Sequence, residues 1–288
     1  MKLLSPKVII LGATGTLGQT VYKYLSTRHA NIMGSSRNKS DNNFLYFKFT
    51  NPHDVEKLLE GQNFAFVINC IGALKGKSEK EQKLLNTNLP KILLKFSKKY
   101  SYRIVHISSD AVFDNLSKKV DEQSSPNPTD SYGKTKLAGE LYENALNIRT
   151  SIIGFDLNEH KGLLEHALEN KKMIGFVNQE WSGATTFQLA KFIEWLIFKK
   201  MFESIYSKTR TVHFAPIGPT TKYKIIKTFS ELLRNAKVKK KAGKKVTRVL
   251  VTKYFDALNI KTYNVNLKKA LMELVEFDKK YVKTYREN

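Results

Sequence analysis

The segment SYGKTKLAGE, residues 131–140, places Tyr132 four residues before Lys136. At helical spacing the two side chains share one face, with Cβ atoms about 5 to 6 Å apart. A phenol has a pKa near 10 and is a poor acid or base at neutral pH until a neighbouring cation stabilises its phenolate. Lys136 is placed to supply that cation. The pair therefore predicts proton transfer by Tyr132, assisted by Lys136.

Ser109 is a third group that can take part in this chemistry. It lies near the end of RIVHISSD, residues 103–110, which is predicted to be a buried strand. Open parallel sheets bind ligands at the carboxyl ends of their strands, where the Ser109 hydroxyl can hold a substrate carbonyl. Tyr-x-x-x-Lys alone is common by chance, but together with a strand that ends in serine it is far more specific. The predicted catalytic residues are therefore Ser109, Tyr132 and Lys136, with Asp110 and Ala111 as further substrate contacts.

A glycine-rich turn, GATGTLG, follows the first apolar run of the chain. Gly12 permits a tight turn, Gly15 lets backbone approach a pyrophosphate, and Gly18 lets helix and strand pack closely. The phosphates then meet the N-terminus of the following helix, at Thr16 and Leu17. Three glycines in a turn are a weak pattern, and the alternative is a turn that binds nothing. The strand–turn–helix context favours dinucleotide binding.

The end of the second predicted strand, GSSRN, indicates which dinucleotide. An acidic residue there would hold the ribose 2′-hydroxyl of NAD, whereas an Arg accommodates the 2′-phosphate of NADP. Ser36 and Arg37 supply a hydroxyl and a cation, and Asp41 is predicted to lie too far along the chain. We therefore expect NADP(H) rather than NAD, the alternative being that Arg37 is a solvated loop residue. Further cofactor contacts are expected from Cys70, Ile71 and Gly72 at the end of the fourth strand, where Cys70 packs without reacting.

Strands and helices alternate through the first half of the chain. This alternation predicts an α/β fold, a Rossmann-type doubly wound parallel sheet covered by helices on both faces. We expect a dinucleotide-binding domain over residues 1–155, joined again by about 184–225, and a smaller substrate-binding region over 156–288. The lysine-rich run KVKKKAGKK, 237–245, is predicted to be a surface loop. Strands are expected at 7–12, 30–36, 43–50, 64–72, 103–110 and 147–154, and helices from Leu17 and at 52–61, 86–100 and 131–146.

The motifs GATGTLG, HISSDAVFDN and YGKTKLAGE together resemble the extended short-chain dehydrogenase/reductase family. Within it they are similar to the dTDP-4-dehydrorhamnose reductase-like sugar-nucleotide reductases, over residues 7 to about 155. The resemblance implies that a Ser109, Tyr132, Lys136 triad reduces a 4-keto group on a nucleotide-linked deoxysugar. Hydride would come from the nicotinamide and the proton from Tyr132.

Departures from the family pattern bear on the substrate. Related dehydratases carry a Glu where this chain has Ala111, which argues against dehydration. Ile152 stands where an aromatic residue commonly contacts the sugar, so the identity of the substrate stays open. Trp181 could stack on a base or sugar, or equally lie in a core. Arg248 could pair with a diphosphate, in competition with Lys244 and Lys245.

Composition limits the remaining classes of function. Of 288 residues, 41% are hydrophobic and 26% charged, which is typical of a globular protein. The net charge of +23 favours anionic partners, but the lysines are spread along the chain, so nucleic-acid binding is not expected. We expect a cytoplasmic protein with no membrane span and no metal site. Its expected partner is a sugar-nucleotide substrate, and a homodimer is left open. An epimerase on the same fold and a non-catalytic NADP-binding regulatory subunit are the alternatives.

Overall fold

A computed structural model describes residues 5–113, 119–156, 162–233 and 236–283 of the chain. The chain divides by its internal contacts into two compact units. Unit 1 comprises Met1–Asp114, Ser125–Arg149 and Ala190–Val212, and unit 2 comprises Asn115–Ser124, Thr150–Leu189 and His213–Asn288. The main span of unit 1 ends at residue 149 and a later segment, Ala190–Val212, returns to it; the predicted division into a cofactor-binding domain, 1–155 with about 184–225, and a substrate-binding region stays a prediction.

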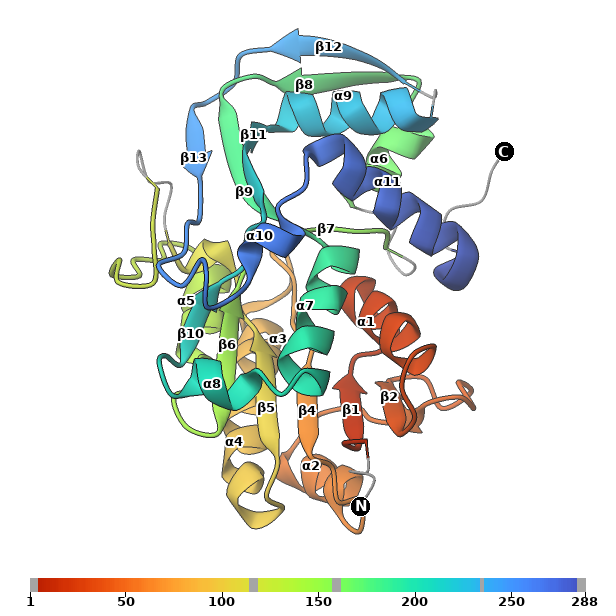
Figure 1. The fold of residues 1–288 in the computed structure, drawn as a ribbon, viewed down its shortest axis with the longest axis vertical. Helices are drawn as coiled ribbons and strands as arrows, with labels where there is room; N and C mark the ends of the chain where they lie inside the picture. Colours follow the sequence, from red (N-terminus) through yellow and green to blue (C-terminus); the bar gives the residue numbers. More distant parts are fainter. Residues whose placement is uncertain (1–4, 114–118, 157–161, 234–235, 284–288) are drawn as a thin grey trace. The chain divides into compact units, whose positions relative to one another are not determined.

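Unit 1 is built on a seven-stranded sheet in the order β10-β6-β5-β4-β1-β2-β3 (Figure 1). Strands β1 to β6 pair in parallel, and all four residues of β1 are buried. The strand order reverses between β1 and β4, which is where doubly wound sheets bind ligands. The predicted Rossmann-type fold is confirmed. The strands are Val8–Leu11 (β1), Ile32–Ser36 (β2), Leu45–Tyr46 (β3), Phe66–Asn69 (β4), Arg103–Ile107 (β5), Ala145–Arg149 (β6) and Thr211–His213 (β10).

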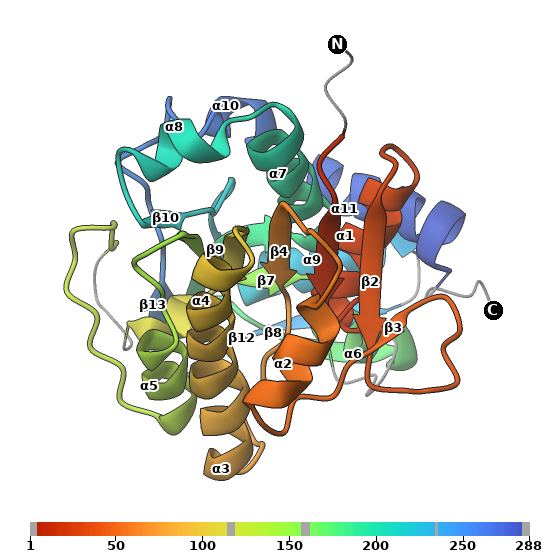
Figure 2. The ribbon, with the colours of Figure 1, turned by 90° about the horizontal axis from the view of Figure 1, so that it is seen from below.

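Helices cover both faces of this sheet, with α1 and α7 on one side and α2, α4 and α5 on the other (Figure 2). Leu17, Val21 and Leu25 of α1 are buried, in agreement with their helical spacing. Among the described helices, none is long and apolar enough to cross a membrane. The helical segments are Thr16–Ser26 (α1), Pro52–Leu59 (α2), Glu79–Gln82 (α3), a π-helical stretch at Lys83–Asn88, Leu89–Lys99 (α4), Ser131–Ala138 (α5), Thr186–Phe198 (α7) and Phe202–Tyr206 (α8).

Helix α5 is shorter than the sequence predicted, ending at Ala138 instead of 146. The next residue, Gly139, passes so close to the π-helical stretch that a Cβ atom there would lie 1.8 Å from the carbonyl oxygen of Asn86. Asn144 then takes a left-handed conformation with φ of 50°. Strand β6 begins at Ala145, two residues before the predicted 147–154, and the predicted third strand shrinks to the two residues of β3.

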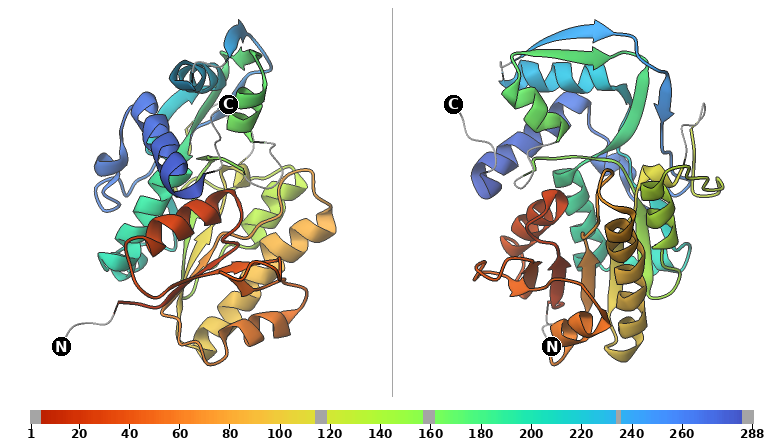
Figure 3. Two further views of the ribbon diagram at one scale, coloured as in Figure 1. Left: turned by 90° about the vertical axis from the view of Figure 1, so that its right-hand side faces the viewer. Right: turned by 180° about the vertical axis from the view of Figure 1, so that it is seen from behind.

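Unit 2 contains two smaller sheets. Strand β9 lies between β11 and β13 and also pairs with β7, while β8 pairs with β12. Helix α9 packs against β8 and β12 (Figure 3). The unit has its own core, which includes Phe155, Trp181 and Phe229. Its elements are Ile152–Ile153 (β7), Leu163–Glu169 (α6), Lys172–Phe176 (β8), Gln179–Thr185 (β9), Ile217–Thr221 (β11), Lys222–Leu233 (α9), Lys237–Lys241 (β12), Val246–Arg248 (β13), Ile260–Tyr263 (α10), Leu267–Phe277 (α11) and a π-helical end at Asp278–Val282.

The lysine-rich run is not the loop that the sequence predicted, because its first half is strand β12. Val238 supplies the apolar contact that makes this possible, since it packs against the core of unit 2. The lysines on either side stay exposed. One apolar residue facing a core therefore outweighs the low strand propensity of its lysine neighbours.

Gly139 gives a test of how α5 is held. Alanine at this position would push a Cβ atom into the Asn86 carbonyl, and backbone cannot move aside as a flexible side chain can. We expect Gly139→Ala to lower the free energy of unfolding by about 1 to 3 kcal/mol, as overpacking does. Urea denaturation followed by circular dichroism measures this. The control is Gly218→Ala, whose Cβ would meet no atom within 4 Å; equal losses in both variants would contradict the packing argument.

Candidate active site

The glycine turn joins β1 to α1 at the carboxyl edge of the sheet. Gly12 has φ of 75°, a conformation that favours glycine, and its amide donates to the Ser35 hydroxyl at 3.2 Å. A Cβ on Gly18 would lie 2.0 Å from the Gly12 carbonyl oxygen, so only glycine allows the helix to approach this closely. Helix α1 begins at Thr16, with Gly15 as its N-cap. Gly12 thus makes the tight turn, and Gly18 the close packing, that the sequence predicted, whereas the approach of a pyrophosphate to Gly15 stays a prediction.

The end of β2 holds Ser36, and Asp41 folds back onto it. The Ser36 hydroxyl donates to the Asp41 carboxylate and accepts from the Asn38 amide at 3.1 Å. Asp41 was expected to lie too far along the chain to be the first choice for the ribose. A turn in which the Asp41 amide donates to the Asn38 carbonyl oxygen at 3.3 Å nevertheless brings its carboxylate back to Ser36. Arg37 is exposed beside them. A cation and a carboxylate therefore both lie at the predicted ribose site.

The ends of β4 and β5 are joined by the side chain of Asn69. Its Oδ1 accepts from the Ile71 amide at 3.1 Å, and its Nδ2 lies 3.2 Å from His106 Nδ1. These contacts fix the turn that contains Cys70, Ile71 and Gly72. Burial raises the pKa of the Cys70 thiol to about 12, against a lowering effect of Lys136, so the thiol is neutral and unreactive at pH 7.

Ser109, Asp110 and Ala111 form the turn that follows β5. The Ser109 hydroxyl accepts from the Ala111 amide at 3.1 Å and donates to Asp110 Oδ1 at 3.2 Å. Helix α5 packs directly on this turn, because a Cβ on Gly133 would lie 2.2 Å from the Ala111 carbonyl oxygen. Tyr132 is the neighbour of Gly133 and lies in the first turn of α5. The fold thus brings the Ser109 turn to the start of the helix that carries Tyr132 and Lys136.

Lys136 is buried, with 5% of its surface exposed, and its Nζ donates to the Ile107 carbonyl oxygen at 2.6 Å. A Cβ on Gly72 would lie 3.8 Å from the same Nζ, so the turn after β4 passes close by. Burial lowers the pKa of Lys136 from 10.5 to about 8, and the Glu140 carboxylate opposes this shift. Lys136 is therefore an ammonium group held at a cost among the ends of β4 and β5.

Asn86, in the π-helical stretch, is a site residue that the sequence analysis missed. It exchanges two hydrogen bonds with the backbone of Ala73, at 2.9 and 3.1 Å, and its Nδ2 also donates to Thr135 Oγ1 at 3.2 Å. It thereby ties the turn after β4 to helix α5. An Asn inside an apolar helical run, NTNLPKILL, was the available signal, since a buried amide needs partners.

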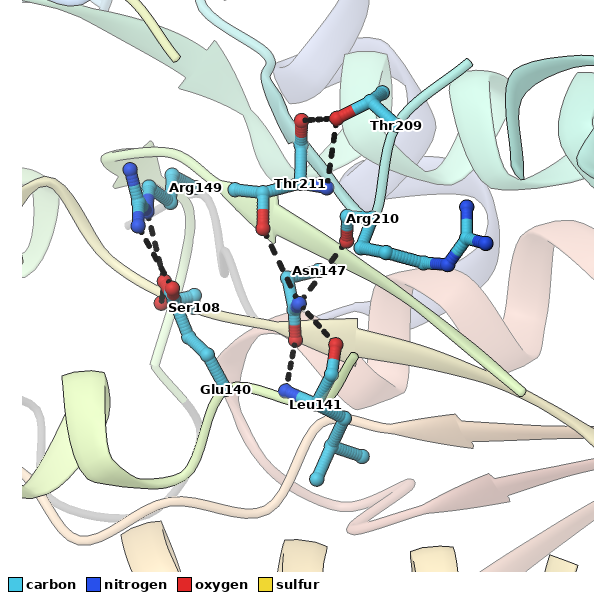
Figure 4. Close-up of polar contacts among 8 residues, drawn as sticks. All are labelled: Ser108, Glu140, Leu141, Asn147, Arg149, Thr209, Arg210 and Thr211. Atoms are coloured by element: carbon cyan, nitrogen blue, oxygen red, sulfur yellow. Dashed lines mark hydrogen bonds and ion pairs between the residues drawn. The ribbon is translucent and has the colours of Figure 1, made fainter. Parts of the chain in front are cut away.

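A buried polar cluster is formed by Ser108, Glu140 and Arg149 (Figure 4). Glu140 accepts two hydrogen bonds from the Arg149 guanidinium, at 2.8 and 2.7 Å, and one from the Ser108 hydroxyl at 2.7 Å. The carboxylate side chain is 0% exposed and that of Arg149 6%. The cluster therefore joins the residues after α5, the end of β5 and the end of β6.

The side chain of Asn147 fixes the loop between α5 and β6. Its Oδ1 accepts from the Leu141 amide at 2.9 Å, and its Nδ2 donates to the carbonyl oxygens of Leu141 and Arg210 (Figure 4). The segment 136–141, which contains Glu140, is thus held by hydrogen bonds at Lys136 and at Leu141. Sequence analysis gave no role to Glu140, Asn147 or Arg149.

Trp181 and Arg248 lie on paired strands of unit 2. Trp181 is buried in the core of that unit, and its indole N–H donates to the Ser151 hydroxyl at 2.8 Å. Burial, and then the charge of Arg248, lowers the pKa of Lys222 at the start of α9, so two cations lie near each other. No group of three or more potential metal-ligating side chains occurs among the described residues.

The buried Lys136 ammonium predicts how stability depends on pH. Because its folded pKa of about 8 lies below the unfolded value, the unfolded chain binds more protons between pH 8 and 10.5, and stability rises there. At pH 7 Lys136 is charged in both states, so burying its charge lowers the free energy of unfolding by the full amount. We expect Lys136→Met to raise the free energy of unfolding at pH 7 by about 1 to 3 kcal/mol and to remove the rise above pH 8. Urea denaturation at pH 7 and pH 9.5 measures both effects. The exposed Lys134→Met is the control, and a Lys136→Met protein less stable at pH 7 would contradict the prediction.

Comparison with known proteins agrees with this fold. Residues 6–263 match the family described as the RmlD substrate binding domain. The beta subunit of methionine adenosyltransferase 2 from Xenopus tropicalis is 31% identical over 138 residues, 46% of this chain and 41% of that protein. A dTDP-4-keto-6-deoxy-D-glucose reductase from Streptomyces niveus is 25% identical over 142 residues, 48% of this chain and 47% of that one. This chain spans about half or less of the length of such relatives.

Among solved structures, the dTDP-4-dehydrorhamnose reductase from Bacillus anthracis in complex with NADP superposes with a TM-score of 0.76. It is 18% identical and covers 96% of this chain and 99% of its own, so this likeness shows the fold. The family match over most of the sequence carries more weight. The chain therefore belongs to the RmlD substrate binding domain family, an NAD(P)-binding family of the extended short-chain dehydrogenase/reductase type.

Proposed function

We propose that the protein reduces a 4-keto group on a nucleotide-diphosphate-linked deoxysugar with NADPH, in the synthesis of a surface polysaccharide or glycan. The observation that carries this proposal is the packing of α5 on the Ser109 turn, with the Lys136 ammonium buried one helical turn from Tyr132. These are the groups that a carbonyl reduction needs: a hydroxyl for the carbonyl oxygen, an acid, and a cation that favours the ionised acid.

The chain's own residues divide the work as follows. The bound nicotinamide cofactor would supply the hydride. The turn at Gly12, Gly15 and Gly18, with Thr16 and Leu17, would hold its pyrophosphate at the N-terminus of α1. Cys70, Ile71 and Gly72 would line its path beside β4. Tyr132 would give the proton to the substrate oxygen, held by Ser109, and Lys136 would stabilise the resulting phenolate.

Substrate contacts are proposed in each unit separately. In unit 1, Asp110 and Ala111 adjoin Ser109 and would contact the sugar. Arg248, with Lys222 near it, gives two cations that suit a diphosphate. Trp181 is buried, and its contact with substrate stays a prediction.

Cofactor preference gives a paired prediction at the end of β2. Arg37 would attract a 2′-phosphate, whereas Asp41, hydrogen-bonded to Ser36, would repel it. We expect Arg37→Ala to weaken NADPH binding about tenfold, or about 1.4 kcal/mol. Asp41→Asn should strengthen NADPH binding and weaken NADH binding, because it removes a carboxylate that could hold the ribose 2′-hydroxyl, whereas Arg37→Ala should change NADH binding far less. Fluorescence titration with both cofactors measures the ratio, and an unchanged ratio in both variants would remove these residues from cofactor selection.

A second function, that of an NADP-binding regulatory subunit without catalysis, is favoured by the relatives. Several of them, including the one from Xenopus tropicalis, are named as the beta subunit of methionine adenosyltransferase 2. The names of the relatives favour this function, whereas the complete set of Ser109, Tyr132 and Lys136 favours the reductase. Both functions require NAD(P) binding.

Turnover separates the two functions. The protein is mixed with NADPH and dTDP- or UDP-linked 4-keto-6-deoxysugars, and absorbance is followed at 340 nm. We expect absorbance to fall, and Tyr132→Phe to reduce the rate at least a hundredfold while binding NADPH normally, since general acid catalysis contributes about 10²- to 10⁴-fold. Tight NADPH binding without consumption on any keto-sugar would instead support the regulatory subunit. A Tyr132→Phe protein with most of the activity would exclude Tyr132 as the acid.

A further inference from the structure

The Lys136 ammonium needs a counter-charge that the carbonyl at Ile107 does not supply. A buried ammonium that donates only to neutral groups tends to lose its proton. The titratable groups that face Lys136 come from several elements. His106 of β5 is neutral because burial holds its pKa well below 6.5, and Cys70 beside β4 is a neutral thiol. Tyr132 lies on the same helix. Glu140 is the carboxylate that acts on Lys136.

The geometry links Glu140 and Lys136 to neighbouring points on one strand. Lys136 Nζ donates to the carbonyl of Ile107, and the Ser108 hydroxyl donates to Glu140. Both ends of the segment 136–140 are therefore fastened to the end of β5, next to Ser109. Glu140 and Lys136 are thus anchored at adjacent residues of the same strand end.

Arg149 pairs with Glu140. The Glu140 carboxylate is 0% exposed and accepts two hydrogen bonds from the guanidinium, so the two buried charges compensate each other. The guanidinium carbon lies 5.2 Å from the ring centre of Phe113, which packs against its flat face. Arg149, at the end of β6, is thus held between the Glu140 carboxylate and the ring of Phe113.

We propose that Glu140 and Arg149 are positioning residues for the proposed reduction: the buried pair fastens α5 to the ends of β5 and β6 and supplies the negative charge that keeps Lys136 protonated. The inference rests on the proposed function for its catalytic consequence. The electrostatic part, that Glu140 keeps Lys136 protonated, needs no catalysis and can be measured on the folded protein without substrate. The two parts can be tested separately.

The test uses Glu140→Gln combined with Arg149→Met, which removes both charges. Removing one partner would leave an uncompensated buried charge and risk unfolding, whereas neutral replacement of a whole pair is often tolerated. The introduced glutamine can still accept from the Ser108 hydroxyl, and the introduced methionine can cover the ring of Phe113. The matched control is Glu194→Gln, which removes a carboxylate bound to Tyr24 and His29 elsewhere in unit 1.

The first measurement is the free energy of unfolding against pH, with and without Lys136→Met, in the wild-type and double-variant proteins. In each background, the free energy of unfolding with Lys136 minus that with Lys136→Met isolates the titration of Lys136. In the wild-type background this difference in free energy should begin to change with pH from about pH 8 upward. In the double variant the change should begin at least one pH unit lower, whereas Glu194→Gln should leave it in place. An unchanged onset in the double variant would overturn the proposal.

The second measurement is the pH profile of keto-sugar reduction. Because Lys136 must be protonated, activity falls as pH rises past its pKa. The double variant should lose activity about one pH unit earlier, which is about a fivefold lower rate at pH 8, and should recover toward pH 6. A loss that is equal at every pH would mean a purely structural role and would overturn the catalytic part. If the wild type reduces no keto-sugar, the proposed function fails while the stability measurement still decides the electrostatic part.

Discussion

The buried ion pair between Glu140 and Arg149 is the contact on which the arrangement of the candidate site depends. It joins three segments that are separate in sequence: the end of α5, the end of β5 at Ser108, and the end of β6. Pairs of this kind contribute little net stability compared with apolar residues, but losing one partner costs about 3 to 5 kcal/mol because the other charge stays buried. The pair therefore works less as a source of stability than as a constraint. The segments can pack only in the geometry that satisfies both charges.

Close backbone contacts supply the second constraint. Gly18 lies against the Gly12 carbonyl, Gly133 against Ala111, and Gly139 against Asn86, each at a separation that a Cβ atom would not allow. At these points helix and turn meet through backbone, which moves less freely than a side chain. The glycine turn, the Ser109 turn and the π-helical stretch are consequently held at fixed distances from the helices that pack on them. The same feature that makes the site rigid also makes these glycines hard to replace.

The sequence predicted the elements whose signals are local and missed those that depend on tertiary contacts. Alternating apolar runs and amphipathic helices gave the Rossmann-type sheet, and the spacing of the glycines gave the turn between β1 and α1. The end of α5 was not predicted, because Glu140 and Leu141 fit a helix, whereas in the structure Glu140 pairs with Arg149 and the Leu141 amide donates to Asn147. Strand β12 was mistaken for a loop because its packing depends on Val238 alone. Asp41 was judged by its distance along the chain, whereas a turn returns it to Ser36.

The cost of the Lys136 ammonium bears on what the site is for. An uncharged side chain such as methionine could fill most of the same space, and the folded chain would gain stability from the change. Sites where a chain breaks a packing rule without local benefit are commonly those that carry function. Binding a dinucleotide at the glycine turn does not by itself require a buried ammonium one helical turn from a tyrosine. Proton transfer by that tyrosine would require it, and in the proposed reduction Glu140 and Arg149 would keep the ammonium charged. This cost is the physical argument for the proposed reductase, and it stands against the names of the relatives, which favour a subunit that only binds the cofactor.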